Sequence, residues 1–257
     1  MNQKIHIVAV GKQNMSDHPG VVCFINPKHP SYPLKVEWLK ERFSEGLQIK
    51  LLYLEGQKKA AGYIEYVPGK FAWRAVSATN YMFIHCLYVY PNNNKNLGYG
   101  TLLIEECMDD ARKQGLAGVA VMVSKLAFMA EGDIFLKNGF SQADSDEQGN
   151  LLLVKQSGEA TLPSFNRLNG DAEKYKGLHI LYSRQCPWVA RLIEEIREEG
   201  ITEQLGITIA EIRTAAEAQQ APSFYGVFNF IHDGKVLADR YVSLTRFKNI
   251  LKKGKLI

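Results

Sequence analysis

The sequence predicts a mixed α/β (α+β) protein made of two domains. Its 257 residues are enough for one large domain or for two modest ones. Strand-like alternation and helix-like spacing of apolar residues follow one another along the chain, which is typical of this fold class. Residues 157–176 show no sustained period and are rich in turn-forming residues. We therefore expect a first domain over residues 1–156, a linker over 157–176 and a second domain over 177–257.

Composition and charge exclude several classes of protein. Apolar residues make up 46% of the chain and charged residues 23%, which is typical of globular rather than disordered proteins. The net charge of +4 is mild and forms no basic stripe, so we expect no nucleic-acid partner. The longest uncharged stretch, from Ala75 to Asn94, is too polar to span a membrane.

The cysteines and the N-terminus indicate a reducing compartment. The four cysteines are far apart and no two have the C-x-x-C spacing, so neither a disulfide framework nor a structural metal site is expected. The first residues lack the basic and apolar regions of a signal peptide. We therefore expect a cytoplasmic protein without a bound metal.

The first block reads as strands followed by alternating helices and strands. Helix-like spacing runs from Leu34 to Phe43, and Gly46 ends it. Two strands and a turn follow, and an apolar strand then ends at a proline. An amphipathic helix comes next, with a buried strand, a helix and a last strand after it. These elements are expected over Ile49–Leu54, Ala60–Val67, Met82–Val89, Gly100–Gln114, Val119–Val123, Phe128–Lys137 and Leu151–Lys155.

The second block predicts the order β-α-β-α-β-β-α. An apolar strand leads into Cys186 and Pro187, and a helix with apolar residues at i, i+3, i+4 and i+7 follows. A later hairpin turns at Asp233-Gly234, which is a strong turn signal. The expected elements are Leu178–Tyr182, a helix ending at Glu199, Ile207–Arg213, Thr214–Gln220, Phe224–Ile231, Lys235–Asp239 and Leu244–Lys252.

The junction between the strand at Met82–Val89 and the following helix is the most informative segment. Glycines there let the backbone approach a ligand, and the first N–H groups of the helix point toward an anion such as a pyrophosphate. Lys95 adds a positive charge and Thr101 a hydroxyl. The third glycine of a dinucleotide fingerprint is missing, and no G-K-[ST] indicates a P-loop. A simple turn at the start of a helix is the alternative interpretation.

The order of these motifs resembles the GNAT family of N-acetyltransferases. Leu87-x-Val89-x-Pro91, Lys95-x-x-Gly98-x-Gly100 and the later Phe135-x-x-x-Gly139-Phe140 carry the resemblance, which covers about residues 1–156. It implies a central mixed sheet and an acetyl-CoA co-substrate, with the pantetheine arm beside the backbone of Leu87 and Val89. The residues implied in cofactor binding are Leu87, Val89, Lys95, Asn96, Leu97, Gly98, Tyr99, Gly100, Thr101 and Phe135.

The candidate catalytic groups depart from the pattern of the family. Many members of the family have a tyrosine at the position of Phe135, where it protonates the CoA thiolate, and Phe135 has no proton to give. Tyr88 or Tyr99 is a candidate substitute. The acceptor ammonium must also lose a proton, and His85 and Glu65 are the two candidate bases. A core histidine and a solvent-facing strand residue are the structural alternatives for these two.

Two further residues are candidates for the acceptor pocket. Trp73 and Arg74 follow the predicted strand Ala60–Val67 and precede the strand that carries His85. We expect them to line the pocket for the amine, with core packing and a surface ion pair as the alternatives. The sequence itself does not name the acceptor amine and carries no signal for the oligomeric state.

The second block resembles the YoaP-like domain, a thioredoxin- and glutaredoxin-like domain found in a subset of GNAT proteins. Ser183-Arg184-Gln185-Cys186-Pro187 matches the active-site turn of such folds, and Ala221-Pro222 stands where they place a cis-proline before a strand. Cys186 at a helix N-terminus is a candidate reactive thiol. Val189 replaces the second cysteine, which excludes two-cysteine redox chemistry. The alternative is a packing or binding module.

The sequence therefore predicts an acetyl-CoA-dependent N-acetyltransferase that moves the acetyl group directly to a primary amine. Two other hypotheses stay open at this point. One is a non-catalytic acyl-CoA-binding protein, which Phe135 makes conceivable. The other is a monothiol redox or adduct-forming protein that uses Cys186.

Overall fold

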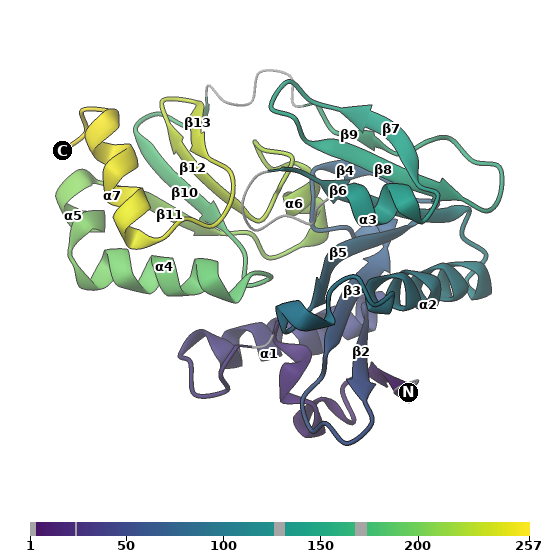
Figure 1. Cartoon of the computed structure of the whole chain (residues 1–257). Helices are drawn as coiled ribbons and strands as arrows, with labels where there is room; N and C mark the ends of the chain where they lie inside the picture. The colour runs from purple at the N-terminus through teal and green to yellow at the C-terminus, as the bar shows by residue number, and fades with distance from the viewer. Residues whose placement is uncertain (1–3, 24, 126–131, 168–173) are drawn as a thin grey trace. The chain divides into compact units, whose positions relative to one another are not determined.

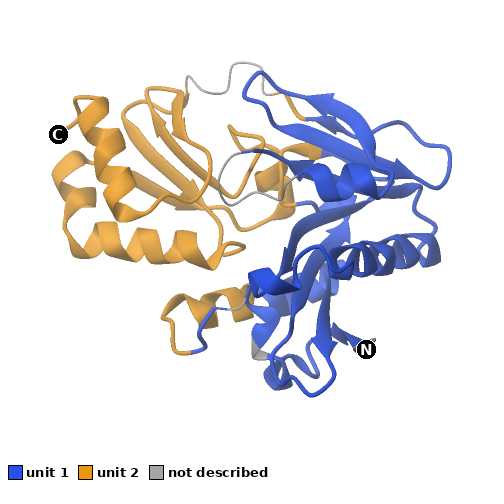
Figure 2. Ribbon diagram, viewed as in Figure 1, with its two compact units in different colours: residues 1–27, 39–72, 77–165 blue, residues 28–38, 73–76, 166–257 orange. Residues whose placement is uncertain are grey.

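The chain folds into two compact units (Figure 2). The computed structural model describes residues 4–23, 25–125, 132–167 and 174–257. Unit 1 comprises residues 1–27, 39–72 and 77–165, and unit 2 comprises residues 28–38, 73–76 and 166–257. Two short segments from the first half of the chain thus belong to the second unit. This division differs from the continuous boundaries expected from the sequence.

A seven-stranded mixed sheet forms the centre of unit 1 (Figure 1). Its order is β1-β2-β3-β5-β6-β8-β7, in which β5 and β6 run parallel and the other neighbouring strands antiparallel. This arrangement confirms the predicted α/β class with a central mixed sheet. The strands are β1 (Ile5–Val10), β2 (Gln48–Leu54), β3 (Gly62–Pro68), β5 (Met82–Val89), β6 (Gly118–Val123), β7 (Ser141–Ser145) and β8 (Leu151–Gln156).

Helix α2 (Tyr99–Lys113) covers one face of this sheet and closes the main core of unit 1. Leu103 and Ala111 on its apolar side are fully buried, as the amphipathic spacing predicts. The core continues onto the strands through Ile64 and Ile84, which face the helix. Because side chains alternate along a strand, the neighbours of these residues on β3 and β5 face the other side of the sheet.

An ion-pair network joins α2 to the sheet beneath it. The Lys50 ammonium on β2 lies 3.1 Å from an Asp110 oxygen and 3.3 Å from a Glu106 oxygen. The hydroxyl of Tyr66 on β3 donates a 2.7 Å hydrogen bond to Asp110. The burial of Lys50 is thus compensated by two carboxylates on one helix.

The remaining elements of the first half of the chain are the helices α1 and α3 and several short segments. Helix α1 (Ser31–Arg42) continues into a 3-10 turn and ends at Gly46, whose φ of +88° suits glycine. Helix α3 (Gly132–Lys137) covers the described end of the helix expected from Phe128, and residues 126–131 lie outside the described residues. The short elements are β4 (Val76–Ser77), β9 (Ser164–Phe165) and 3-10 turns at Met15–Asp17, Pro19–Val21, Phe43–Glu45, Gly69–Phe71 and Asn92–Asn94.

Unit 2 contains a four-stranded sheet with the order β11-β10-β12-β13. Strands β10 and β11 run parallel, whereas β12 runs antiparallel to both of its neighbours. Apolar residues of α4 and α7 pack on one face of this sheet. The elements are β10 (Leu178–Tyr182), α4 (Pro187–Glu198), α5 (Ile201–Leu205), β11 (Thr208–Glu211), α6 (Ala215–Gln219), β12 (Phe228–His232), β13 (Lys235–Ala238) and α7 (Leu244–Lys253).

Unit 2 differs from the sequence expectation in three places. The short helix α5 was not predicted and follows directly after Gly200. Strand β12 begins at Phe228 rather than Phe224, because Gly226 adopts a φ of +75° that lies outside the strand region. The Ala221–Pro222 peptide bond is trans, and the cis bond found among the described residues joins Tyr90 and Pro91. The cis-proline expectation is therefore wrong.

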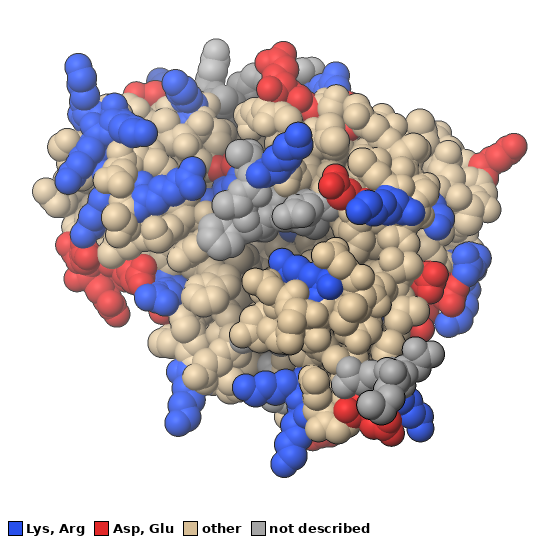
Figure 3. All heavy atoms as spheres, in the orientation of Figure 1, with Lys and Arg blue, Asp and Glu red and all other residues tan. Residues whose placement is uncertain are grey.

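Charges of both signs are interspersed on the face shown in Figure 3. Basic side chains gather around α7 in that view, and the exposed ones there are Arg246, Lys252 and Lys253. Lys252 and Lys253 lie in the last turn of α7, where the helix dipole favours cations. Within the described ranges, none of the helices is both long enough and apolar enough to cross a membrane.

Candidate active site

The two candidate bases, Glu65 and His85, lie next to each other in the structure. Nδ1 of His85 is 3.2 Å from Oε1 of Glu65, and both side chains are buried. The separation is that of an ion pair rather than of a well-aligned hydrogen bond. In enzymes, such contacts tighten when the substrate binds. The structure therefore joins two residues that the sequence offered as separate candidates.

An irregularity between β3 and β5 brings the two residues together. Glu65 pairs with Cys86, whereas the next residue, Tyr66, pairs with Ile84. His85 is thus an extra residue on β5, and the strand has a β-bulge at this position. A bulge re-aims a side chain locally and is frequent beside active sites. Ile84 and Leu87 both pack toward α2, so the bulge leaves both residues between them, His85 and Cys86, on the face of the sheet on which Glu65 lies.

Tyr63 completes this cluster and was missed by the sequence analysis. Its hydroxyl donates a 2.6 Å hydrogen bond to Oε2 of Glu65, and its side chain is fully buried. Burial, and then the nearby Glu65 carboxylate, raise the pKa of Tyr63 well above its usual value. The sequence signal that could have pointed to Tyr63 was its spacing from Glu65, because residues two apart on a strand share a face.

Strands β5 and β6 separate beside this cluster. Their register runs from Met82 to Ile84, opposite Val119 to Val121, whereas β5 stays paired with β3 up to Val89. Leu87 and Val89 lie beyond the end of this register and are half-buried. Where two parallel strands separate in this way, an extended ligand can pair with the backbone.

The glycine loop begins where β5 ends and leads into α2. Lys95, Asn96, Leu97 and Gly98 are exposed, and Gly98 is the N-cap residue with a φ of +84°. Gly98 provides no side-chain cap, and the first helical hydrogen bond runs from the Leu102 N–H to its carbonyl. The backbone N–H groups at the start of α2, before Leu102, therefore have no carbonyl of the same helix to donate to. They can instead bind an anion.

The two glycines of this loop are needed for different reasons. A Cβ on Gly98 would meet no atom within 4 Å, so glycine is favoured there by the positive φ alone. A Cβ on Gly100 would lie 2.4 Å from Cδ1 of Ile134, so the start of α2 packs closely against α3. The Thr101 hydroxyl accepts a 3.2 Å hydrogen bond from Asn138, which fixes the same junction. Asn138 is a second residue that the sequence analysis did not single out.

The other predicted aromatic residues of unit 1 differ in burial and contacts. Phe135 is fully buried in the core, with its ring edge-on to Phe140 at 5.3 Å, so its part in cofactor binding stays a prediction. Tyr88 is 45% exposed and stacks on Tyr90, with 6.2 Å between the ring centroids. Tyr99 is buried in the first turn of α2.

The two candidate acceptor residues belong to unit 2. Trp73 is buried and lies edge-on to Trp38, with ring centroids 5.2 Å apart. Arg74 is also buried, donates a 3.2 Å hydrogen bond to the Gln185 side chain and stacks 4.4 Å above the Tyr225 ring. The surroundings of Trp73 are those of a core residue, which was the alternative interpretation. A role of either residue in binding the acceptor stays a prediction.

Cys186 caps the N-terminus of α4 in unit 2. Its thiol is half-buried, and its carbonyl accepts the Val189 N–H at 3.1 Å. Arg184 is held by Glu211 at 2.9 Å and by Glu37 at 3.4 Å. Arg184, two residues before Cys186, is therefore paired with two carboxylates, which reduces the effect of its positive charge on the thiol.

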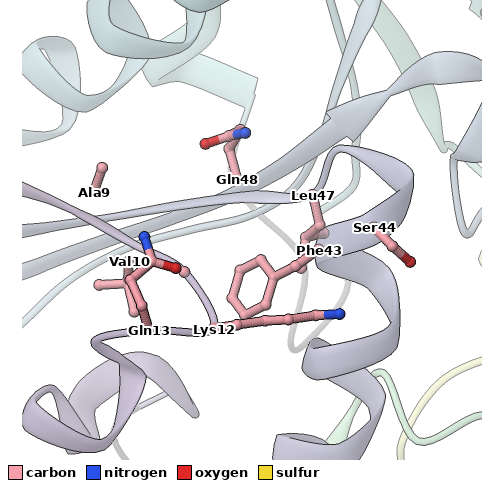
Figure 4. Close-up of a pocket in the computed structure, with 9 residues that line it drawn as sticks. Ala9, Val10, Lys12, Gln13, Phe43, Ser44, Leu47 and Gln48 are labelled. Carbon is pink, nitrogen blue, oxygen red and sulfur yellow. The ribbon is translucent and has the colours of Figure 1, made fainter.

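A cavity of about 390 Å³ lies elsewhere in unit 1 (Figure 4). It is formed between the end of β1 and the turn that follows α1, with Lys12, Phe43 and Gln48 around it. None of the predicted site residues lines this cavity. Within the described residues, no group of three or more His, Cys, Asp or Glu side chains is arranged to hold a metal ion.

The comparison with known families decides the class of unit 1. Residues 20–128 match the model of the acetyltransferase (GNAT) family. The chain carries a GNAT acetyltransferase domain. This confirms the enzyme class that the sequence predicts, an acetyl-CoA-dependent N-acetyltransferase.

Comparisons with individual proteins give similar relatives. The chain is 29% identical over 252 residues to the uncharacterized N-acetyltransferase YoaP of Bacillus subtilis, covering 95% of this chain and 97% of YoaP. A GNAT acetyltransferase structure from Streptococcus pneumoniae matches with a TM-score of 0.44 and 17% identity, covering 60% of this chain and all of that one. YhbS of Escherichia coli, solved in complex with CoA, matches with a TM-score of 0.44 and 14% identity, covering 66% and 96% of the two chains.

Proposed function

We propose that the GNAT domain transfers the acetyl group of acetyl-CoA directly to a primary amine, with His85 as the general base. The observation that carries this proposal is the buried contact between His85 and Glu65, at the point where β5 and β6 separate. Direct transfer requires a base beside the place where the acetyl group and the amine are held together.

The end of β5 and the glycine loop suit the two ends of the co-substrate. The pantetheine arm would pair with the backbone of Leu87 and Val89, which lie beyond the end of the register between β5 and β6. The pyrophosphate would bind the N–H groups at the start of α2, close to the exposed Lys95. Strand and helix meet at Val89, whose side chain would lie 3.9 Å from a Cβ on Gly100.

The proposed reaction follows from the chemistry of these groups. The acceptor ammonium, with an ordinary pKa of about 10.4, loses a proton toward Nε2 of His85. Because the His85 side chain is closed to bulk solvent, a water molecule carries this proton. The amine nitrogen then bonds to the thioester carbon, the carbon–sulfur bond breaks and CoA leaves as a thiolate. The attacking nitrogen loses its second proton, which neutralises the departing thiolate, so that the products are the neutral amide and the CoA thiol. With a thiol pKa of about 8.5, this thiolate leaves without an obligatory acid.

Glu65 supports His85 in this scheme rather than acting alone. With Oε1 next to Nδ1, the carboxylate favours the tautomer that carries its proton on Nδ1 and leaves Nε2 as the acceptor. It also stabilises the imidazolium that forms during the reaction. Tyr88 is exposed and remains the candidate that returns a proton to the thiolate.

Initial-rate kinetics test whether the transfer is direct. Rates of CoA release are measured while acetyl-CoA and an accepted amine are both varied. Direct transfer predicts intersecting lines in the double-reciprocal plot, because both substrates must be bound together. Parallel lines, with acetylated protein found by mass spectrometry, would overturn it in favour of an acetyl-enzyme intermediate.

Unit 2 has features that favour a thioredoxin-like fold and a second candidate function. The antiparallel position of β12 between β10 and β13, and a cysteine at the start of α4, support this assignment. The thiol of Cys186 is then a monothiol site, since Val189 cannot resolve a disulfide. Mixed-disulfide formation with oxidised glutathione at Cys186, absent in Cys186→Ser, tests this function separately from acetyl transfer.

A further inference from the structure

We propose that Tyr63 is a positioning residue of the acetyl-transfer site, acting on His85 through the carboxylate of Glu65. This inference rests on the proposed function, because it assigns Tyr63 a role within that site. The Tyr63 hydroxyl donates to Oε2 of Glu65 at 2.6 Å, and the other oxygen lies 3.2 Å from Nδ1 of His85. The three side chains form one continuous buried chain from phenol to imidazole.

Each link of this chain is fixed by the fold. Tyr63 and Glu65 lie two residues apart on β3 and therefore share a face of the sheet. His85 lies on the same face, because it follows Ile84, which packs toward α2. With a contact on each oxygen, the carboxylate cannot rotate without losing one of them. Its orientation relative to the imidazole is therefore set by Tyr63.

The hydroxyl also stabilises the charge on which the site depends. A buried carboxylate is unfavourable unless hydrogen-bond donors compensate for its lost hydration. Burial and the Glu65 charge raise the pKa of Tyr63, so its hydroxyl keeps its proton and remains a donor. Among the described residues, Cys23 and Cys86 also act on Tyr63 through their charges, and both raise its pKa further.

Removal of the hydroxyl should therefore change how the site takes up protons. Without the donor, the anionic carboxylate is less stable, and the Glu65–His85 pair binds a proton at higher pH. Protonation of the pair removes the free Nε2 base or the carboxylate that orients it. The acid side of the pH–rate profile should then move to higher pH, by about one unit for a charged hydrogen bond.

The same strand provides a matched control. Tyr66 is also fully buried on β3 and donates to a carboxylate, that of Asp110, at 2.7 Å. It faces the opposite side of the sheet, toward α2. Tyr66→Phe removes the same atom from an equivalent hydrogen bond, so it measures the general loss of stability. Of these two variants, only Tyr63→Phe removes a hydrogen bond to the Glu65–His85 pair.

The kinetic test compares wild type, Tyr63→Phe and Tyr66→Phe. CoA release is followed against pH with saturating acetyl-CoA and whichever of spermidine, tyramine and lysine wild type uses. For Tyr63→Phe we expect about tenfold lower kcat, an unchanged KM for acetyl-CoA and the shifted acid limb, while Tyr66→Phe keeps the wild-type profile. An unshifted limb in Tyr63→Phe, or an equal shift in both variants, would overturn the proposal.

A spectroscopic readout separates this inference from the proposed function. Nitrogen NMR of the histidine side chains reports the His85 tautomer without an acceptor, and His85→Gln assigns the signal. We expect proton occupancy on Nδ1 in wild type and Tyr66→Phe, and a mixture of tautomers in Tyr63→Phe. An unchanged tautomer in Tyr63→Phe counts against Tyr63 alone. A wild type that acetylates no amine counts against the proposed function.

Discussion

The imidazole of His85 lies against the carboxylate of Glu65, with Nδ1 3.2 Å from Oε1, at a β-bulge of β5. In a regular ladder, His85 and Cys86 would point to opposite faces of the sheet. Because Ile84 and Leu87 both pack toward α2, the two residues between them share the face of Glu65. The contact therefore forms at an irregular point in the pairing of the two strands.

Substitution of the pair should affect turnover and leave co-substrate binding intact. We expect His85→Gln to lower kcat about a hundredfold or more, because the general base is lost. Glu65→Gln should lower it about tenfold, because the imidazole loses its orienting partner but remains. Acetyl-CoA affinity, measured by calorimetry, should stay near the wild-type value in both. His6→Gln, at an exposed position on β1, is the control; a wild-type kcat in His85→Gln would contradict the assignment.

The glycine loop can be tested at Gly98 without a steric clash. Gly98→Asp adds a negative charge to the anion-binding N-terminus of α2, in space where a Cβ meets nothing within 4 Å. Gly98→Asn has the same size and the same positive φ but no charge, so it controls for backbone strain. We expect acetyl-CoA affinity to fall at least about tenfold more in the aspartate variant. Equal affinities of the two variants in calorimetry would place the pyrophosphate elsewhere.

The Asp110 network predicts a dependence of stability on pH. Burial alone would raise the pKa of Asp110, but hydrogen bonds from Tyr66 and Lys50, and the Lys50 charge, hold it below its ordinary value of 3.8. A depressed folded pKa stabilises the fold above the unfolded pKa, and this contribution is lost as the pH falls below about 4. Asp110→Asn should therefore lower the free energy of unfolding by about 3 kcal/mol at pH 7 and by less at pH 3.

The choice of probe matters for this measurement. All three tryptophans, Trp38, Trp73 and Trp188, lie in unit 2, so their fluorescence does not report on Asp110 directly. Amide hydrogen exchange in α2 does, because the network ties this helix to the sheet. A difference between wild type and variant that stays constant from pH 7 to pH 3 would contradict the predicted linkage.

The four cysteines should differ in reactivity. Burial, and then the Asp110 charge, raise the pKa of Cys107 well above its ordinary value against the opposing effect of Lys50. Cys107 should therefore react with iodoacetamide only after unfolding, whereas the half-buried Cys186 at a helix N-terminus should react in the native protein. Peptide mass spectrometry resolves the four sites, with Cys186→Ser as the control. Native labelling of Cys107 as fast as Cys186 would refute this order.

Much of the fold could be predicted from the sequence because its periodicity is strong. Strands β5 and β10 have the bounds expected from Met82–Val89 and Leu178–Tyr182. Strand β7 (Ser141–Ser145) was missed, since its polar residues at the edge of the sheet carry no apolar alternation. The first strand, Ile5–Val10, was not predicted either, although it is an apolar run and forms the opposite edge of the same sheet.

The site was predictable in its parts and less so in its geometry. The loop around Gly98 carries a motif, so its residues could be named in order. The bulge at His85 has no signature in the residue types of β5, because it arises from the pairing with β3. The assignment of Trp73 and Arg74 to unit 2 likewise depends on contacts between distant segments, which a single sequence does not display.

The most direct test of the account is a balance of products from the wild-type chain. Purified protein is mixed with acetyl-CoA and a panel of primary amines, and both free CoA thiol and acetylated amine are quantified. We predict equal amounts of the two products with at least one amine, because each transfer releases one CoA. Free CoA without acetylated amine, or no CoA release with any amine while acetyl-CoA binds, would contradict the claim that this site performs N-acetyl transfer.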